Sequence, residues 1–241
     1  MSRSPWSRPD GRVLGGQSES LAPLRSRLLR GAQVATRRVI VDLGAGTGAV
    51  TPELVRRGGG EVVAVDGAED FLALPEGPFA GARRVRASST ALPLGDSSVD
   101  LVFCQMALLW MPLSETLDEV RRVLAPGGAL VAIEPDLGGL VEWPESRGVR
   151  DIWLRALAAA GADPQVGRKL PGMLAARGFG VTVQLLSEVG PGGPERLLPL
   201  EGLPLTEEER ARVDELGRGG EGPWQTFAWA PMFGVTATLR G

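Results

Sequence analysis

The chain has 241 residues, of which 43% are hydrophobic and 23% charged, a composition typical of one soluble globular domain with a substantial core. No apolar run approaches the roughly 20 residues needed to cross a bilayer, and residues 1–10 lack the apolar stretch of a secretory signal, so we expect a cytoplasmic protein without a membrane span. The net charge of −3 disfavours a nucleic-acid partner.

The missing residue types exclude several kinds of active site. The chain has no histidine, which excludes Ser-His-Asp and Cys-His catalysis and histidine-based metal sites. Its single cysteine, Cys104, excludes an internal disulfide and a multi-cysteine metal site, and is most simply a small buried hydrophobic residue. We therefore expect no bound metal.

In chain order, the first predicted helix covers residues 19–30, where leucines at positions 21, 24, 28 and 29 recur with a helical period. Arginines occupy positions between and after these leucines. Their spacing is typical of the solvated face of a helix and its exit. The arginines concerned are Arg25, Arg27, Arg30, Arg37 and Arg38.

The next stretch, residues 39–50, is the one around which the remaining elements are organised. Its apolar run Val39-Ile40-Val41-Asp42-Leu43 predicts a strand buried on both faces, and hence a parallel sheet. The run leads into Gly44-Ala45-Gly46-Thr47-Gly48, whose glycines allow a sharp turn and bring a ligand close to bare N–H groups. This spacing is G-x-G-x-G, not the dinucleotide fingerprint G-x-G-x-x-G. Asp42 would repel a pyrophosphate but could pair with an ammonium group, which favours a zwitterionic amino-acid ligand over a phosphate.

A second buried strand, Glu61–Asp66, ends in an acid that is followed by Gly67. An acid at the tip of the second strand of a βαβ unit is well placed to accept hydrogen bonds from both hydroxyls of a ribose. Taken alone, the two stretches also fit any nucleotide-binding βαβ unit, or a glycine-rich turn without a ligand.

Further elements follow along the chain. In the first half we expect a helix over 51–57, a short helix over 68–74, a third strand over 83–87, a fourth over 99–104, a helix over 114–124 capped by Ser114, and a fifth strand over 129–133. In the second half we expect a loop over 137–150, helices over 151–160 and before Gly178, a sixth strand over 181–186, a helix to Leu216 opened by a capping box at Thr206, and a last, antiparallel strand over 224–240.

Two runs carry a more specific pattern. Ser88-Ser89-Thr90-Ala91-Leu92-Pro93-Leu94 precedes an Asp-led fourth strand, and Arg-Arg-Val-Leu-Ala-Pro-Gly-Gly (121–128) precedes the fifth. With the glycine stretch and the second strand, these runs make residues 36–136 resemble the class I S-adenosylmethionine-dependent methyltransferases. The second half is similar to small-molecule members, including the ubiquinone and menaquinone methyltransferases.

The resemblance implies an α/β fold with a Rossmann-like, mostly parallel seven-stranded sheet. Its strand order would be 3-2-1-4-5-7-6, with the last strand antiparallel and helices on both faces. One methyltransferase domain would span residues 1–241. Its parts would be a cofactor-covering segment (1–35), a cofactor-binding half (36–136) and a substrate-side half with insertions (137–241).

The resemblance also implies S-adenosylmethionine as cofactor and S-adenosylhomocysteine as product, bound at the carboxyl ends of strands 1, 2 and 4. Asp42 would lie near the methionine amino group, and Asp66 would hold the ribose. Ser88 stands where the family places an acid for the adenine amino group, and a hydroxyl accepts that hydrogen bond without charge assistance. The expected cofactor-binding residues are Gln17, Asp42, Gly44, Ala45, Gly46, Gly48, Asp66, Gly67, Ser88, Ser89, Thr90, Gln105 and Met106.

Methyl transfer from a sulfonium is a direct displacement, in which the protein aligns the reactants and excludes water. A general base is needed only when the acceptor must first lose a proton. Because histidine and tyrosine are absent, the candidates are two carboxylates after the fifth strand, Glu134 and Asp136. The alternative is that they are solvated loop acids or hydrogen-bond the cofactor. Trp110, Trp143 and Arg168 are candidate substrate-binding residues, with ordinary packing or surface roles as the alternative.

The predicted function is therefore methyl transfer to a small, partly apolar molecule at O, N or C. An RNA or protein methyltransferase is disfavoured by the acidic charge balance and by Gln105-Met106-Ala107-Leu108, which stands where an Asn/Asp-Pro-Pro-Tyr motif would lie. A non-catalytic S-adenosylmethionine-binding regulatory protein remains open. The glycine spacing and Asp42 disfavour a dinucleotide-dependent oxidoreductase. The sequence leaves the oligomeric state open.

Overall fold

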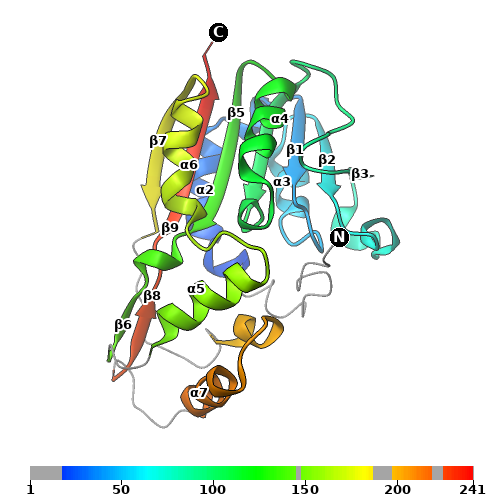
Figure 1. Cartoon of the computed structure of the whole chain (residues 1–241). Helices are drawn as coiled ribbons and strands as arrows, with labels where there is room; N and C mark the ends of the chain where they lie inside the picture. The colour runs from blue at the N-terminus through cyan, green and yellow to red at the C-terminus, as the bar shows by residue number, and fades with distance from the viewer. Residues whose placement is uncertain (1–17, 145–147, 187–196, 219–224, 241) are drawn as a thin grey trace.

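A seven-stranded sheet with strand order β3-β2-β1-β4-β5-β9-β7 forms the centre of the molecule (Figure 1). The computed structural model describes residues 18–144, 148–186, 197–218 and 225–240. The strands are β1 (Val39–Leu43), β2 (Glu61–Asp66), β3 (Ala82–Arg86), β4 (Val99–Gln105), β5 (Leu124–Pro135), β7 (Phe179–Leu185) and β9 (Met232–Leu239). The predicted Rossmann-like order is confirmed, with β7 and β9 as the sixth and seventh strands.

Helices cover both faces of the sheet because its central strands are apolar on both sides. On one face, α2 (Ala22–Gly31) and α3 (Thr51–Arg57) pack against side chains such as Ile40 and Phe103. On the other face lie α4 (Leu113–Val123) and α6 (Val166–Ala175). This two-sided burial explains why the strand sequences read as continuous apolar runs rather than as alternating patterns.

Strand β9 runs antiparallel to both of its neighbours, β5 and β7, whereas all other neighbouring pairs are parallel. The carboxyl ends of β1, β2, β4 and β5 therefore meet at one edge of the sheet, the lower edge in Figure 1. In open α/β sheets this edge is where ligands bind.

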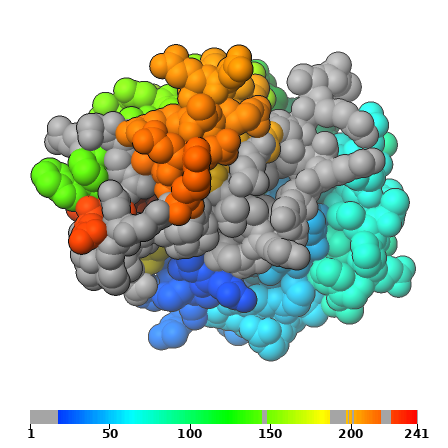
Figure 2. All heavy atoms as spheres, turned by 90° about the horizontal axis from the view of Figure 1, so that it is seen from below, coloured from blue at the N-terminus to red at the C-terminus, as the bar shows by residue number. Residues whose placement is uncertain are grey.

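A second layer, which we call the cap, lies beyond this edge, below the part of the sheet formed by β5, β9 and β7 (Figure 1). The cap consists of η6 (Leu137–Gly139), β6 (Val141–Trp143), α5 (Val149–Ala159), η9 (Leu198–Gly202), α7 (Glu207–Gly217) and β8 (Phe227–Trp229). Buried cap residues such as Leu157 and Leu200 belong to the same apolar cluster as the sheet residues Val102 and Leu130. Seen from the cap side, η9 and α7 lie well apart from the residues around β3 (Figure 2). Within the described ranges, no helix is long and apolar enough to cross a membrane.

The cap differs from the expectations for this part of the chain. Residues 137–150 were expected to be a loop, but they include β6, which pairs with β8 in a separate two-stranded sheet. The expected single strand over 224–240 is divided into β8 and β9. Pro231 lies at the division, where its lack of an N–H group interrupts a ladder, and its carbonyl accepts a hydrogen bond from the Asp136 amide at 2.9 Å.

Two further local predictions were wrong. Helix α4 begins at Leu113, with Pro112 at the N-cap, and the Ser114 hydroxyl instead accepts a 2.8 Å hydrogen bond from Arg177 Nη2. The short helix expected over 68–74 is reduced to the 3-10 turn η3 (Phe71–Ala73). Outside the cap, the other 3-10 turns in the described part of the chain are η2 (Val34–Thr36), η4 (Gly77–Phe79) and η5 (Leu108–Trp110). By contrast, the predicted capping box at Thr206 is present at the start of α7.

Candidate functional site

The glycine loop after β1 (residues 44–48) is hydrogen-bonded to the end of β2. The amides of Gly44 and Ala45 donate to the Val65 carbonyl at 2.8 and 3.0 Å, which continues the parallel pairing past the end of β1. Asp66 then holds the loop from the side, because its Oδ2 accepts from the Gly46 amide at 2.9 Å and its Oδ1 from the Ala68 amide at 2.9 Å. The glycine loop and Asp66, which the sequence predicted to bind the cofactor, are thus in direct contact.

The three loop glycines all adopt positive φ angles of +75°, +53° and +80°, but their surroundings differ. A Cβ atom at Gly44 would lie 2.4 Å from Ala107 Cβ, and one at Gly48 would lie 2.8 Å from Pro78 Cβ. A Cβ atom at Gly46 would meet nothing closer than the Gly44 carbonyl oxygen at 4.0 Å. The backbone at Gly46 therefore faces open space, as a cradle for a closely approaching ligand requires.

Asp42 lies beneath the loop with an exposed fraction of 3%, and its Oδ2 accepts a 2.6 Å hydrogen bond from Thr51 Oγ1. Burial raises the pKa of the Asp42 carboxyl to about 6, a shift that the Thr51 hydrogen bond and the charge of Arg25 oppose and the charge of Asp66 enhances. Two carboxylates, Asp42 and Asp66, thus flank the glycine loop. Such a site repels a phosphate and favours a positively charged group. The residues present fit the amino-acid and ribose portions of S-adenosylmethionine.

The serine-rich segment after β3 runs beside the tip of β2. The Ala87 amide donates to the Asp66 carbonyl at 3.0 Å, which places the predicted adenine-side residues next to Gly67. Ser88 is exposed and its hydroxyl is 2.9 Å from Thr90 Oγ1, whereas the Ser89 hydroxyl turns to Thr116 Oγ1 at 2.8 Å on α4. Ser88 and Thr90 therefore lie on the open side of the segment, while Ser89 contacts α4.

The turn after β4 forms the wall opposite β2. It contains Met106, a non-glycine residue with φ of +54°, whose amide donates to the Ile133 carbonyl at 2.9 Å. A left-handed backbone at a residue with a long side chain is uncommon and often marks a functional site. Ala107 follows and packs against Gly44, so this turn and the glycine loop are in van der Waals contact.

The buried side chain of Glu134 is hydrogen-bonded to the backbone of this turn. Its exposed fraction is 0%, and its Oε1 accepts hydrogen bonds from the amides of Ala107 at 3.0 Å and Leu108 at 2.9 Å. Burial raises the pKa of the Glu134 carboxyl to about 7, against the lowering effect of these backbone hydrogen bonds. The other oxygen, Oε2, has no hydrogen-bond partner among the described residues. Cys104 lies beside this group, fully buried as predicted, with Sγ 3.8 Å from Oε1.

The structure pairs two residues for which the sequence predicted separate roles. Asp136, expected in catalysis, is 4% exposed, and its Oδ2 accepts from Nε of Arg168, expected in substrate binding, at 2.8 Å. The Arg168 Nη2 atom lies 2.8 Å from the same oxygen. The Asp136 Oδ1 atom has no hydrogen-bond partner within the described ranges.

The two candidate tryptophans occupy different surroundings. Trp110 is partly buried in η5, directly after the β4 turn, and its amide donates to the Ala107 carbonyl at 3.0 Å. Trp143 is 56% exposed on β6, on the opposite side of the molecule from β1 and β2 (Figure 1). The structure thus brings Trp110, but not Trp143, to the glycine-loop end of the sheet. Gln17 lies outside the described residues.

Sequence reasoning missed Arg25, which it placed on a solvated helix face. Arg25 is 5% exposed, and its guanidinium contacts Glu53 on α3 and Gln105 at the end of β4. A signal was present, because position 25 lies four residues after Leu21 and three before Leu28, on the apolar face of α2. The assignment of Arg25 to solvent was therefore wrong.

Comparison with known proteins agrees with this geometry. Residues 41–132, from β1 to β5, match the family model described as "Methyltransferase domain". An uncharacterized methyltransferase-like protein of Schizosaccharomyces pombe is 36% identical over 107 residues, covering 44% of this chain and 42% of that protein. A malonyl-[acyl-carrier protein] O-methyltransferase of Halorhodospira halophila is 44% identical over 108 residues, covering 43% of this chain and 36% of that enzyme. The chain thus spans less than half the length of the curated relatives it matches.

Solved structures match over most of the chain. An S-adenosylmethionine-dependent methyltransferase of Mesorhizobium loti aligns with a TM-score of 0.54 at 22% identity, covering 87% of this chain and 95% of that one. The [4+2]-cyclase SpnF aligns with a TM-score of 0.61 at 17% identity, covering 91% and 81%. At these identities the matches establish the fold alone, a Rossmann-like α/β fold that this chain shares with S-adenosylmethionine-dependent methyltransferases and with a cyclase.

Proposed function

We propose that this chain, which has the class I methyltransferase fold and matches a methyltransferase domain over residues 41–132, is an enzyme that transfers a methyl group from S-adenosylmethionine to a small-molecule acceptor. The observation that carries the proposal is the glycine loop with two carboxylates beside it. Gly46 leaves its backbone open to a ligand, and Asp42 and Asp66 give the site a charge suited to an ammonium and a ribose but not to a pyrophosphate.

The proposed cofactor-binding roles follow from the positions of the side chains. Asp42 would accept from the ammonium group, Asp66 from the ribose hydroxyls, and Ser88 would accept from the adenine amino group. Gln105 and Met106 would line the opposite wall at the end of β4. When bound, S-adenosylmethionine supplies an electrophilic methyl group, and the residues around it orient the acceptor and exclude water.

The two predicted general bases are better explained as positioning residues. Glu134 is 0% exposed, and its hydrogen bonds to Ala107 and Leu108 shape the β4 turn that packs on Gly44. Asp136 is 4% exposed and paired with Arg168. We therefore propose a direct displacement in which the chain contributes alignment rather than proton removal by these two carboxylates.

The acceptor would bind between the β4 turn and the cap. The fold alone does not identify it, since a cyclase shares this architecture. One relative is named as an enzyme that methylates a malonyl group on an acyl carrier protein. A similarity to the ubiquinone and menaquinone methyltransferases stays a prediction, and so does the assignment of Trp110 to the acceptor side.

Calorimetric titration with S-adenosylmethionine, S-adenosylhomocysteine and NAD tests the proposal. We expect micromolar affinity for the two sulfur compounds and none for NAD. Asp66→Ala should weaken binding at least tenfold, because it removes the ribose acceptor and the hydrogen bond to the Gly46 amide. Asp70→Ala is a matched control, an exposed aspartate four residues along the chain.

Turnover is measured next, by the release of S-adenosylhomocysteine in the presence of candidate acceptors. Affinity with turnover establishes the enzyme, whereas affinity without turnover on any acceptor favours the non-catalytic regulatory alternative. Well-folded protein that binds neither sulfur compound would remove the methyltransferase assignment.

A further inference from the structure

We propose that Arg25 is a positioning residue that controls cofactor affinity by joining three separate segments around the glycine loop, an inference that rests on the proposed function. The three segments are Ser18 in the helical residues 18–20 before α2, Glu53 on the helix that follows the loop, and Gln105 at the end of β4. Arg25 touches all three through one buried guanidinium.

The contacts are short and specific. Arg25 Nε lies 2.7 Å from Glu53 Oε2, and Nη1 lies 2.9 Å from the Ser18 carbonyl oxygen and 3.0 Å from Gln105 Oε1. The Ser18 hydroxyl is 3.5 Å from the same nitrogen. A planar guanidinium can hold these partners at once because its donors form a fixed fork, which an ammonium group lacks.

Burial makes this arrangement sensitive to change. The Arg25 side chain is 6% exposed and that of Glu53 is 16% exposed, so neither charge is well solvated. Burial alone would raise the pKa of the Glu53 carboxyl, but hydrogen bonds from Arg25 and Arg57 lower it below its usual value. Removing one member of such a group leaves the remaining charge buried without its partner.

Two of the three partners belong to elements that border the proposed cofactor site. Glu53 belongs to α3, whose first turn also carries Thr51, the hydrogen-bond donor to Asp42. Gln105 is one of the predicted cofactor-binding residues, and Arg25 fixes the orientation of its amide. The positive charge of Arg25 also favours the ionised form of Asp42. Arg25 therefore affects both walls of the crevice without lying on the glycine loop itself.

Arg57 provides a matched control. It shares Glu53 with Arg25, with Nη1 2.6 Å from Glu53 Oε1, and its other contacts are to Ser26. It has no hydrogen bond to Ser18 or Gln105 among the described contacts. Arg57→Met thus disturbs the same carboxylate but leaves the link to β4 in place.

The test is the dissociation constant for S-adenosylhomocysteine, measured by calorimetry on the full chain, with thermal melting to show that each variant is folded. We expect Arg25→Met to raise the dissociation constant about tenfold and Arg57→Met to raise it less than about threefold. Arg25→Lys, which keeps the charge but loses the fork, should lie between wild type and Arg25→Met. A partial rescue of this kind distinguishes positioning from a general loss of stability.

A double-mutant cycle with Gln105→Met tests whether Arg25 acts through Gln105. The two changes should be strongly non-additive, so that adding Gln105→Met to Arg25→Met changes the dissociation constant less than about twofold. In the Arg57→Met background, Gln105→Met should raise the dissociation constant by the same factor as it does in the wild-type chain.

Four outcomes are decisive. Wild-type affinity in folded Arg25→Met overturns the inference and leaves the proposed function intact, as does full additivity with Gln105→Met. If Arg25→Met does not fold, Arg25→Lys decides, and unchanged affinity in that variant overturns the inference. Absence of binding by the wild-type chain itself overturns the proposed function, and the role of Arg25 with it.

Discussion

At the scale of single residues, Asp42 combines a cost in stability above pH 6 with its proposed role in binding the cofactor. Its pKa rises from 3.8 to about 6 because folding buries the carboxyl. A native state that holds its proton more tightly than the unfolded chain is favoured at low pH. The stabilisation of the folded state that results from this proton binding is therefore fully present below pH 3.8 and is lost as the pH rises through 6. Two pKa units correspond to roughly 3 kcal/mol.

Asp42→Asn should reveal both effects. At pH 8 the ligand-free variant should melt at a higher temperature than wild type, because it avoids burying a charge, and the difference should shrink towards pH 4. Its affinity for S-adenosylhomocysteine should fall at least tenfold, because the ammonium group loses its partner. In wild type, affinity should decline as the pH falls through 6. Calorimetry and thermal melting across pH 4–8 check these expectations, and a variant that is less stable at pH 8 would contradict the first.

Glu134 offers a test that separates a base from a positioning group. Glu134→Gln keeps an oxygen for the Ala107 and Leu108 amides but cannot accept a proton, so it should retain affinity and most of the turnover. Glu134→Ala leaves two buried amides without an acceptor and should destabilise the chain by about 2–5 kcal/mol. Denaturant unfolding and steady-state kinetics measure the two quantities. A loss of turnover beyond about 100-fold in Glu134→Gln would indicate a base after all.

At the scale of elements, the glycine loop makes a prediction that differs from one glycine to the next. Gly44→Ala should destabilise the chain by about 2–4 kcal/mol, because the φ angle is positive and the new methyl overlaps Ala107. Gly46→Ala should lose only about 1–2 kcal/mol, since its surroundings are open, but it should abolish cofactor binding.

Gly178→Ala is the control for the backbone effect. Its φ is +87° and a Cβ atom there would meet nothing within 4 Å, so its loss of stability should match that of Gly46→Ala with no change in affinity. Unfolding in urea and titration with S-adenosylhomocysteine give the two readings. Equal affinities for Gly46→Ala and wild type would show that the ligand does not approach this part of the loop.

The elements also show what a sequence reveals at this scale. Strands β1, β2, β4 and β5 were predictable because burial on both faces leaves a local apolar signature. The division of the last strand into β8 and β9 was not, because β8 pairs with β6, about 85 positions away in the chain, and a pairing at that distance leaves no local pattern. Ser114 was mistaken for a cap because nothing near it in the sequence shows that Arg177 would occupy its hydroxyl.

The same reasoning explains which parts of the site were predictable. The glycine loop was predictable because its backbone requires glycine at positive φ angles, and Asp66 because an acid directly after a buried strand is a local pattern. The pairs Arg25–Gln105 and Asp136–Arg168 were not predictable, because their members are 80 and 32 positions apart. The local sequence around one member of a pair gives no information about the other. A local pattern of residue types can be recognised in one sequence, whereas a side-chain contact between distant positions cannot.

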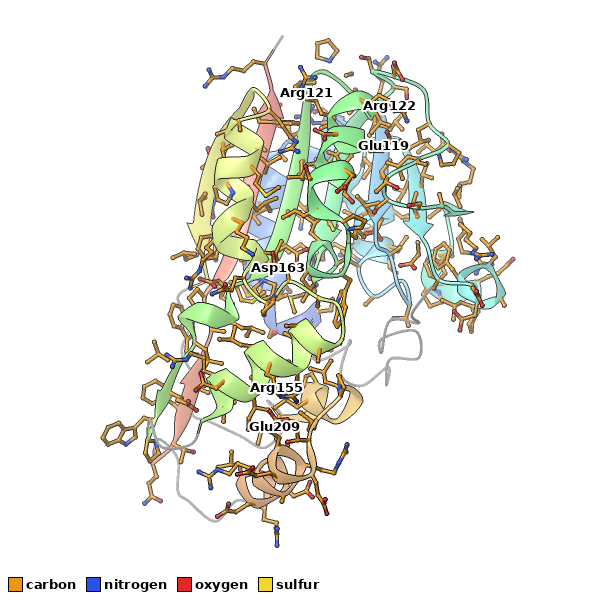
Figure 3. The ribbon with its side chains drawn as sticks, in the orientation of Figure 1. Glu119, Arg121, Arg122, Arg155, Asp163 and Glu209 are labelled. Carbon is orange, nitrogen blue, oxygen red and sulfur yellow. The ribbon has the colours of Figure 1, made fainter. Side chains whose placement is uncertain are left out.

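At the scale of the whole molecule, the cap and the sheet share one apolar cluster, so we expect them to unfold together. Arg155 and Glu209 also join α5 to α7 within the cap, while Glu119 and Arg122 pair at the far end of α4 (Figure 3). Leu200→Ala, at a cap position with 0% exposure, should lower the stability of the entire chain by about 2–5 kcal/mol.

Differential scanning calorimetry checks this prediction. A single transition should move to lower temperature in Leu200→Ala, whereas Leu72→Ala, at a position that is 52% exposed, should leave it unchanged. Two transitions, of which Leu200→Ala shifts only one, would show that the cap is an independent unit.

The contact between α2 and β9 has a consequence for how the chain acquires this structure during synthesis. Gly234 of β9 lies so close to α2 that a Cβ atom there would be 2.8 Å from Leu28 Cδ1 and 3.0 Å from Leu24 Cδ1. Residues 22–31 leave the ribosome early, yet the part of their packing surface that β9 supplies exists only after residues 232–239 have emerged and entered between β5 and β7. Until then Leu24 and Leu28 lack their contacts with β9, so a nascent chain that stalls before β9 would leave the helix bearing Arg25 partly uncovered and open to chaperones and proteases.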